Sequence, residues 1–184
     1  LTLKSLQDTL FLGPLPDDLI TRYDGFLTDY ERYVEGELES YFVNCKIYGS
    51  LDYVFGSGTA LFEKCDFINI NDNRAIGYVC APSHSLKQAL GFTFYNCNFT
   101  KEEGFNAEIY LARPWRDYGK CTFISCKTPS ITPQAFDRWN DTYRNQTARF
   151  EHFDCSLNPV DWAKELTKEQ ADKILSNAFK NCKN

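Results

Sequence analysis

The phrase Phe-x-x-Cys recurs along this 184-residue chain, in Tyr41-Phe-Val-Asn-Cys45, Leu61-Phe-Glu-Lys-Cys65, Thr93-Phe-Tyr-Asn-Cys97 and Thr122-Phe-Ile-Ser-Cys126. We align Arg149-Phe-Glu-His-Phe-Asp-Cys155 as a looser fifth copy, with two extra residues between Phe150 and Cys155. The five cysteines are 20, 32, 29 and 29 residues apart. Variable spacings in this range are typical of a solenoid, in which each coil stacks equivalent side chains on those of its neighbours.

The phrases predict strands, and the segments between them predict turns. Large apolar residues alternate with polar ones in the phrases, whereas Asn, Gly and Asp gather between them. A right-handed parallel β-helix fits this pattern better than a β-sandwich, whose turns would recur at about 8–12 residues. The cysteines should then point inward as small apolar rungs. Adjacent coils lie about 4.8 Å apart, which makes Cys45 and Cys65, one short coil apart, the best candidates for a disulfide.

The two ends of the chain depart from the repeat. Thr167-Lys-Glu-Gln170 has the form of a helix capping box, and apolar residues at helical spacing then predict a helix over 168–180 that packs over the solenoid. Residues 11–40 read as a long irregular excursion, and long loops of this kind often border a binding groove. We therefore expect a single β-helix domain over residues 1–184, with 11–40 as an inserted loop.

Composition and missing motifs exclude several classes of protein. The formal net charge of −5 argues against nucleic-acid binding, and no apolar run approaches the roughly 18 residues of a membrane span. The eight cysteines contain no C-x-x-C pair, which argues against structural zinc. His84 and His152 lack metal-ligand spacing, so we expect both to be structural or solvated. Phosphate loops and dinucleotide fingerprints are absent. The sequence thus favours a monomer without metal, cofactor, nucleic acid or membrane partners.

Two aspartates lie in strand-like, apolar surroundings. Asp8 lies in Leu6-Gln-Asp-Thr-Leu10, and Asp52 lies in Gly49-Ser-Leu-Asp-Tyr-Val-Phe-Gly56. An ionised carboxylate is costly in such a place unless it is paired or functional, and these two segments alone leave both readings open. The segment Arg113-Pro-Trp115 adds a guanidinium that can hold a carboxylate and a flat apolar surface that suits a sugar ring.

Together these segments resemble a known family. Gln7-Asp8-Thr9-Leu10, Asp52-Tyr-Val-Phe-Gly56 and Leu111-Ala-Arg-Pro-Trp115 are similar, in this order, to the QDTL, DFIFG and LGRPW motifs of the pectinesterases (pectin methylesterases). The resemblance implies a right-handed parallel β-helix and hydrolysis of methyl esters on galacturonate units of pectin, without metal or cofactor. The family's early coils have no counterpart here, so the resemblance implies the later part of a catalytic domain whose N-terminal coils are missing from this sequence.

The resemblance also implies roles for individual residues. Asp52 would be the nucleophile that forms an acyl-enzyme, and Asp8 would be the acid that protonates methanol and then the base that activates water. Gln7 would hold the oxyanion. Arg113 would orient Asp52 and keep it ionised, because two nearby carboxylates cannot both ionise cheaply and the one beside a guanidinium keeps the lower pKa.

Further implications concern substrate binding and location. Trp115 and Phe55 would contact the sugar, and Cys45 and Cys65 match two cysteines that family members bridge. Secretion is inferred from the polymeric substrate. Two rival functions remain open: a non-catalytic β-helix module that binds polyuronate, and a polysaccharide lyase on the same fold. The lyase is weaker because such enzymes typically use Ca²⁺ held by acidic clusters, and this site offers too few carboxylates.

Overall fold

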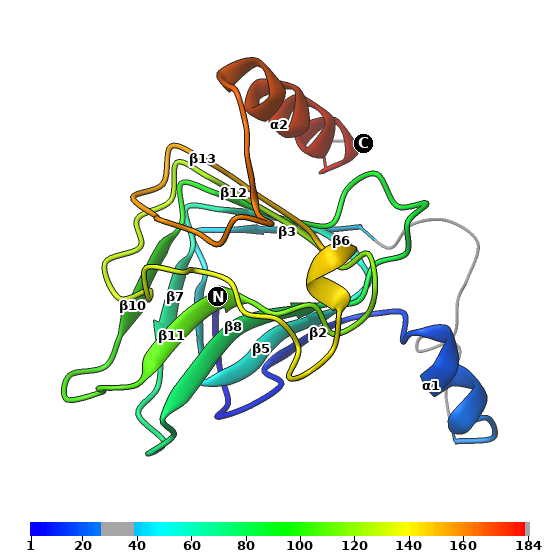
Figure 1. Cartoon of the computed structure of the whole chain (residues 1–184), viewed down its shortest axis with the longest axis horizontal. Coiled ribbons are helices and arrows are strands. Elements are labelled where there is room, and N and C mark those ends of the chain that lie inside the picture. Colours follow the sequence, from blue (N-terminus) through cyan, green and yellow to red (C-terminus); the bar gives the residue numbers. More distant parts are fainter. Residues whose placement is uncertain (27–38, 183–184) are drawn as a thin grey trace.

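The computed structural model describes residues 1–26 and 39–182, in which three sheets wind around a common core (Figure 1). The first sheet contains β1 (Thr2–Lys4), β4 (Lys46–Gly49), β7 (Asp66–Asn69) and β10 (Asn98–Lys101). The second contains β2 (Leu10–Leu12), β5 (Leu51–Gly56), β8 (Ile76–Pro82) and β11 (Glu108–Ala112). The third contains β3 (Glu39–Val43), β6 (Thr59–Glu63), β9 (Phe92–Tyr95), β12 (Lys120–Ile124), β13 (Arg149–Phe153) and β14 (Lys164–Glu165). Neighbouring strands pair in parallel, β1 to β12 enter the three sheets in turn, and β13 and β14 extend the third sheet alone, so the predicted parallel β-helix is confirmed.

The phenylalanines of the repeat form a continuous stack inside the third sheet. The rings of Phe42, Phe62, Phe94 and Phe123 follow one another with centroid distances of 4.8, 4.9 and 4.6 Å. In-register parallel pairing causes this stack, because it places equivalent side chains about 4.8 Å apart on successive coils. The rings of Phe67 and Phe99, from the first sheet, stack at 5.0 Å and meet the same core. Aromatic stacking therefore supplies the interior that the repeated Phe predicts.

The repeat cysteines form an inward row beside these rings, as predicted. Cys45, Cys65, Cys97 and Cys126 are buried, whereas Cys155 is half-buried. Each thiol after the first donates to a carbonyl of the preceding coil, as Cys97 does to Phe62 O at 3.3 Å. The predicted Cys45–Cys65 disulfide is not formed, since both residues are free thiols. Parallel stacking explains this difference, because it aims equivalent Cα–Cβ bonds in the same direction rather than toward each other.

The alignment of the fifth copy is also wrong. The β12–β13 register pairs Phe123 with His152, which places Cys155 beside Cys126 without any insertion. The repeat phrase in this coil is therefore His152-Phe-Asp-Cys155, with histidine in place of phenylalanine. The sequence alignment put Phe150 in the place of the repeat phenylalanine. In the structure Phe150 pairs with Cys121, an inward-facing residue two positions before Phe123.

The predicted excursion over residues 11–40 is more regular than expected. It begins inside β2 and contains the helix α1 (Asp17–Arg22), and its final residues belong to β3. Residues 27–38 lie outside the described residues. Arg116, which follows β11, forms an ion pair with α1. Its Nε and Nη2 atoms donate to the two carboxylate oxygens of Asp18 at 2.9 and 2.7 Å. This ion pair fixes α1 near the second sheet (Figure 1).

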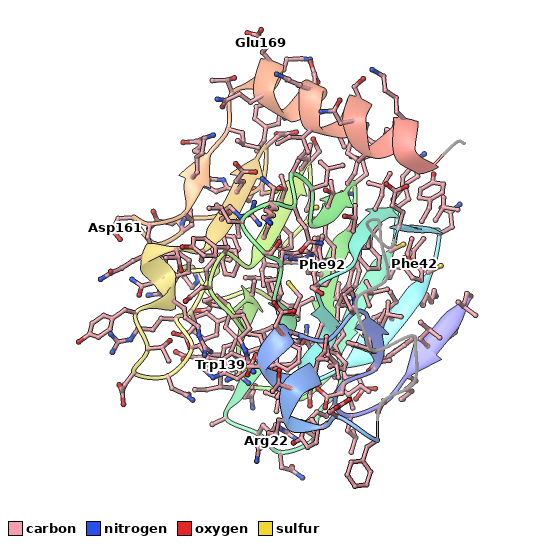
Figure 2. All side chains as sticks on the ribbon, turned by 90° about the vertical axis from the view of Figure 1, so that its right-hand side faces the viewer. Arg22, Phe42, Phe92, Trp139, Asp161 and Glu169 are labelled. Carbon is pink, nitrogen blue, oxygen red and sulfur yellow. The ribbon has the colours of Figure 1, made fainter. Side chains whose placement is uncertain are left out.

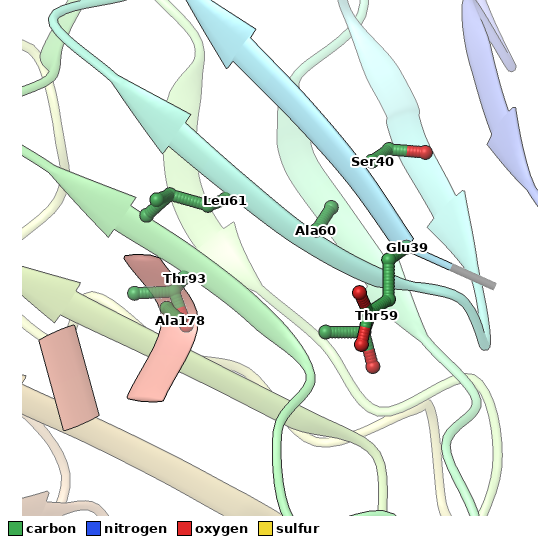
Figure 3. A pocket seen from close by; sticks show the side chains of 7 residues that line it. All are labelled: Glu39, Ser40, Thr59, Ala60, Leu61, Thr93 and Ala178. Atoms are coloured by element: carbon green, nitrogen blue, oxygen red, sulfur yellow. The ribbon is translucent and has the colours of Figure 1, made fainter. Parts of the chain in front are cut away.

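The predicted C-terminal helix is confirmed as α2 (Lys168–Cys182), which lies over the third sheet (Figure 1). Its capping box forms as expected: Gln170 N donates to Thr167 Oγ1 at 3.2 Å, and Thr167 N donates to Gln170 Oε1 at 3.0 Å. A cavity of about 10 Å³ lies between α2 and the sheet and is lined in part by Leu61, Thr93 and Ala178; Figure 3 shows the side chains that line it. That volume suits about one water molecule rather than a substrate. Within the described residues no helix has the length and apolarity to cross a membrane.

Both histidines are structural. His84 is fully buried: its Nε2 donates to Gly58 O at 3.0 Å, and its Nδ1 accepts from Lys120 N at 3.2 Å. Burial lowers the pKa of His84 to about 4, so the ring is neutral at pH 7. Its ring also packs edge-on against Phe92, labelled in Figure 2, at 4.7 Å. Burial likewise lowers the pKa of His152.

A left-handed residue stands directly before each cysteine of the row. Asn44, Lys64, Asn96, Ser125 and Asp154 have φ between 51° and 53°. This conformation turns the chain sharply from the third sheet toward the next strand or segment. Left-handed backbone costs roughly 1–2 kcal/mol for most L-residues, and Asn and Asp tolerate it best. The turns of the solenoid therefore explain the polar residue that precedes cysteine in each phrase.

We predict that Asn96→Ala lowers the free energy of unfolding by about 1 kcal/mol, because alanine lacks the short polar side chain that eases left-handed backbone. Asn98→Ala is the matched control, since Asn98 lies two residues away in the extended strand β10. Urea denaturation of the two variants and the parent protein measures the difference. An equal loss in both variants would contradict the assignment of this cost to the turn.

Candidate active site

The two aspartates of the sequence motifs occupy equivalent positions on adjacent coils. Gln7 pairs with Leu51 in a parallel bridge, and Asp8 N donates to Leu51 O at 3.3 Å. The next residues continue the same register, in which Leu10 pairs with Val54. Asp8 and Asp52 are 44 positions apart in the sequence, yet they lie on successive coils. Stacking brings together two acids that are far apart in the sequence.

A local irregularity in the backbone turns both acids out of the core. Asp8 and Asp52 have φ of 53° and 48°, and the β5–β8 register shifts between Leu51 and Val54. The shift has the character of a β-bulge, which re-aims a side chain and is frequent next to active sites. Tyr53 consequently enters the core, where it is fully buried, while the Asp52 carboxylate lines an outer cavity.

Arg113 holds Asp52 through both of its carboxylate oxygens. Arg113 Nε donates to Oδ1 at 3.0 Å, and Nη2 donates to Oδ2 at 2.6 Å. Arg113 follows β11, two strands away from β5, and Ala81 of the intervening strand lines the same cavity. Both side chains of the pair are nearly buried, with 13% of Arg113 and 11% of Asp52 exposed.

Two aromatic rings enclose the Arg113 guanidinium. Its Cζ lies 4.0 Å from the ring centroid of Tyr78 and 4.2 Å from that of Trp139. Tyr78 is itself fixed, because its hydroxyl donates to Asp137 Oδ2 at 2.6 Å. Asp137 N in turn donates to Ala112 O at 3.0 Å, so the segment after Phe136 returns across the end of β11. This enclosure restricts the guanidinium to the plane from which it binds Asp52.

The predicted sugar-contacting residues lie in the same place. The rings of Phe55 and Trp115 meet edge-to-face with centroids 5.9 Å apart, and Phe11 packs on Phe55 at 5.1 Å. Trp115 N donates to Pro82 O at 3.0 Å, which extends the pairing along β8 past Arg113. A cavity of about 200 Å³ opens between these groups and is lined by Gln7, Asp8, Asp52, Phe55, Ala81, Trp115 and Trp139.

The structure thus brings the predicted catalytic and sugar-contacting residues together. Gln7, Asp8, Asp52, Phe55 and Trp115 line the cavity, and Arg113 lies directly behind it, in contact with Asp52. Sequence reasoning missed Tyr78, Asp137 and Trp139 (Trp139 is labelled in Figure 2). None of the three lies in a recognised motif, and only Trp139 carried a signal, as one of three tryptophans in the chain. Within residues 1–26 and 39–182, no three His, Cys, Asp or Glu side chains gather as a metal site.

The electrostatics of the two acids differ. Burial raises the pKa of Asp8, although the hydrogen bond from Gln7 and the charge of Arg113 act against the rise. Burial also raises the pKa of Asp52, with the Arg113 hydrogen bonds opposing the rise and the Asp8 charge adding to it. Asp52 accepts two charged donors, whereas Asp8 accepts, among the described residues, a neutral side-chain amide from Gln7 Nε2 at 3.4 Å. The two charged donors of Arg113 favour the ionised form of Asp52, and Asp8 has no such pair of donors among the hydrogen bonds of the described residues.

Comparison with known proteins agrees with this arrangement. The family model described as Pectinesterase matches residues 30–171. Putative pectinesterase 11 from Arabidopsis thaliana is 30% identical over 147 residues, which cover 76% of this chain and 40% of that protein. The chain spans about two fifths of the length of curated relatives such as this one.

Two solved structures share the fold. A pectin methylesterase from carrot superposes with a TM-score of 0.73 at 16% identity, over 93% of this chain and 51% of that one. A pectin methylesterase from Yersinia enterocolitica gives a TM-score of 0.67 at 23% identity, over 93% and 55% of the two chains. The family model covers most of the chain, including the motifs around Asp52 and Arg113. This chain therefore belongs to the pectinesterase family.

Proposed function

We propose that this chain carries the catalytic centre of a pectin methylesterase, which removes methyl esters from galacturonate units and yields pectate and methanol. The pectinesterase family acts on pectin, and the family model matches residues 30–171, which include Asp52 and Arg113. The observation that carries the proposal is the contact of both Asp52 oxygens with Arg113, beside Asp8 and at the floor of an aromatic cavity. That contact supplies an anionic nucleophile next to a proton-holding acid.

In the first half of the proposed reaction, an oxygen of the Asp52 carboxylate attacks the carbonyl carbon of the methyl ester. The carbonyl π electrons move onto oxygen, and the amide N–H of Gln7 donates to the resulting oxyanion. When the oxyanion collapses, the bond to the methoxy oxygen breaks and Asp8 gives its proton to that oxygen. Methanol leaves, and the galacturonate carbonyl remains bound to Asp52 as a mixed anhydride.

In the second half, Asp8 acts as a base, because it has just lost its proton. It accepts a proton from water, and the hydroxide oxygen attacks the carbonyl carbon of the anhydride. The bond to Asp52 breaks, and Arg113 receives the released carboxylate through its two N–H donors. The galacturonate leaves as the free acid and ionises in water. Asp52 is again ionised and Asp8 again protonated, so the cycle closes without a metal or cofactor.

The proposed substrate is a pectin chain that lies across the cavity. Phe55, Trp115 and Trp139 present flat apolar surfaces to one side of the acids, and such surfaces suit the C–H faces of sugar rings. Because the proposed substrate is a cell-wall polymer, the localisation that we propose is extracellular. We favour the enzyme over a non-catalytic polyuronate-binding module, because a binding surface has no need of a buried Asp52–Arg113 pair, which is costly to desolvate.

Replacing the nucleophile separates these two functions. We expect Asp52→Asn to lower methanol release from methylated pectin on the order of 10⁴-fold or more, because the amide is a poor nucleophile of nearly the same size. A gas-chromatographic assay of methanol measures this loss, with Asp161→Asn, at an exposed site, as the matched control. Pectin binding by the wild-type protein without any Asp52-dependent release of methanol would support the binding module instead.

The pH profile provides a second test. Asp52 must be ionised to attack, so kcat/KM should fall as the pH drops through its pKa, which burial raises above 3.8. Asp8 must be protonated to release methanol, so kcat/KM should fall again as the pH rises through its own raised pKa. We therefore expect a bell-shaped profile for the wild-type protein.

The geometry of Arg113 predicts a shift of this profile. Arg113→Lys removes one of the two donors, which raises the pKa of Asp52 and moves the acidic limb to higher pH. Because the nucleophile also loses its fixed orientation, kcat should fall on the order of 10²-fold. Arg22→Lys in α1 serves as the control. An acidic limb at the wild-type pH in Arg113→Lys would contradict the role of this pair.

A further inference from the structure

The side-chain amide of Gln7 has a hydrogen-bond partner on each side. Its Oε1 accepts from Arg74 Nη2 at 3.3 Å, and its Nε2 donates to Asp8 Oδ2 at 3.4 Å. An arginine has only donors, so the atom that faces Arg74 must be the amide oxygen. The amino group must then face Asp8 and the cavity. Arg74 thereby determines which end of this symmetric-looking amide reaches the substrate.

Arg74 is held in place by a buried carboxylate. Arg74 Nε donates to Asp72 Oδ2 at 2.5 Å, and Arg74 N donates to Asp72 Oδ1 at 3.2 Å. The Asp72 side chain is only 6% exposed. Ser50 Oγ bonds to the same carboxylate, and the hydroxyl also lies 2.9 Å from Leu6 O. The turn between β7 and β8 is therefore tied to the residues that precede Gln7, and no step of the proposed reaction uses this network.

The wrong orientation of the Gln7 amide would oppose the reaction. With the amide rotated by half a turn, its carbonyl dipole would face the oxyanion and repel it, whereas the correct orientation offers an N–H. The two orientations have similar shapes, so packing alone selects neither. A cation that can only donate hydrogen bonds selects the orientation in which the amide oxygen faces it. Arg74 is the cation in contact with Gln7 Oε1.

We propose that Arg74 is a positioning residue, which holds the carbonyl oxygen of Gln7 so that the amide N–H groups face the ester carbonyl. The inference rests on the proposed function, in which Gln7 donates to the oxyanion. Arg74 itself does not touch the substrate, since it lies behind Gln7 and outside the residues that line the cavity. Its effect should therefore appear in kcat, with KM nearly unchanged.

A double-mutant cycle tests this role. Methanol release is measured for the full chain, for Gln7→Ala, for Arg74→Ala and for the double variant, with Arg22→Ala as a control for the loss of a guanidinium. We expect Gln7→Ala to lower kcat by about 10²–10³-fold and Arg74→Ala to lower it on the order of 10-fold or more. In the Gln7→Ala background, Arg74→Ala should cause no further loss, because no amide remains to be oriented. The same loss in both backgrounds, or no loss in either, would overturn the proposal.

Arg74→Lys covers the case in which alanine unfolds the protein by leaving Asp72 without its cation. Lysine keeps a positive charge beside Asp72 but lacks the fork that contacts both Asp72 and Gln7. We expect this variant to fold and to show the same loss in kcat, again only when Gln7 is present. Wild-type kcat in a folded Arg74→Lys would count against the proposal.

A spectroscopic measurement keeps the two proposals separate. The ¹H–¹⁵N signals of the Gln7 side-chain amide are identified by their disappearance in Gln7→Ala. We expect Arg74→Lys to shift or broaden these signals while the other Gln side chains keep theirs. If the wild-type protein released no methanol, the proposed function would fail and this measurement would still decide the role of Arg74. Unchanged Gln7 signals would overturn it.

Discussion

In-register parallel pairing between successive coils is the constraint on which the rest of the structure depends. It stacks the repeat phenylalanines at 4.6–4.9 Å and aligns the cysteines in one row. The same pairing brings Asp8 next to Asp52 across 44 residues of sequence. A solenoid coil can contain an insertion without losing its register. In the sequence α1 lies between the two acids, yet they still occupy equivalent positions on adjacent coils. The candidate active site therefore depends on the stacking of the coils as well as on its own residues.

Sequence reasoning predicted those parts of the protein that carry a periodic or local signal. The Phe-x-x-Cys phrase records which side chains face inward, so the β-helix could be inferred before any strand was seen. The capping box at Thr167 and Gln170 depends on residues within one helical turn and was equally readable. Gln7, Asp8, Asp52, Arg113, Phe55 and Trp115 were found through their motifs, and the fold brings them together.

The remaining features depend on contacts that no short segment encodes. Tyr78, in β8, and Trp139, in the segment after Phe136, enclose the Arg113 guanidinium. In the sequence, no motif distinguishes either residue from the other aromatic residues. His152 takes the place of a repeat phenylalanine, which only the β12–β13 register reveals. The disulfide between Cys45 and Cys65 was expected because coil spacing permits it, yet the direction of the side chains decides the outcome.

The left-handed backbone at Asp8 and Asp52 has a consequence for the choice of acid. Among acidic residues, only aspartate has a carboxylate close enough to its own main chain to ease this conformation by local hydrogen bonding, and glutamate is one methylene too long. The main chain therefore discriminates between two side chains of identical chemistry, independently of any contact with a ligand. Selection for aspartate at both positions is built into the path of the polypeptide itself.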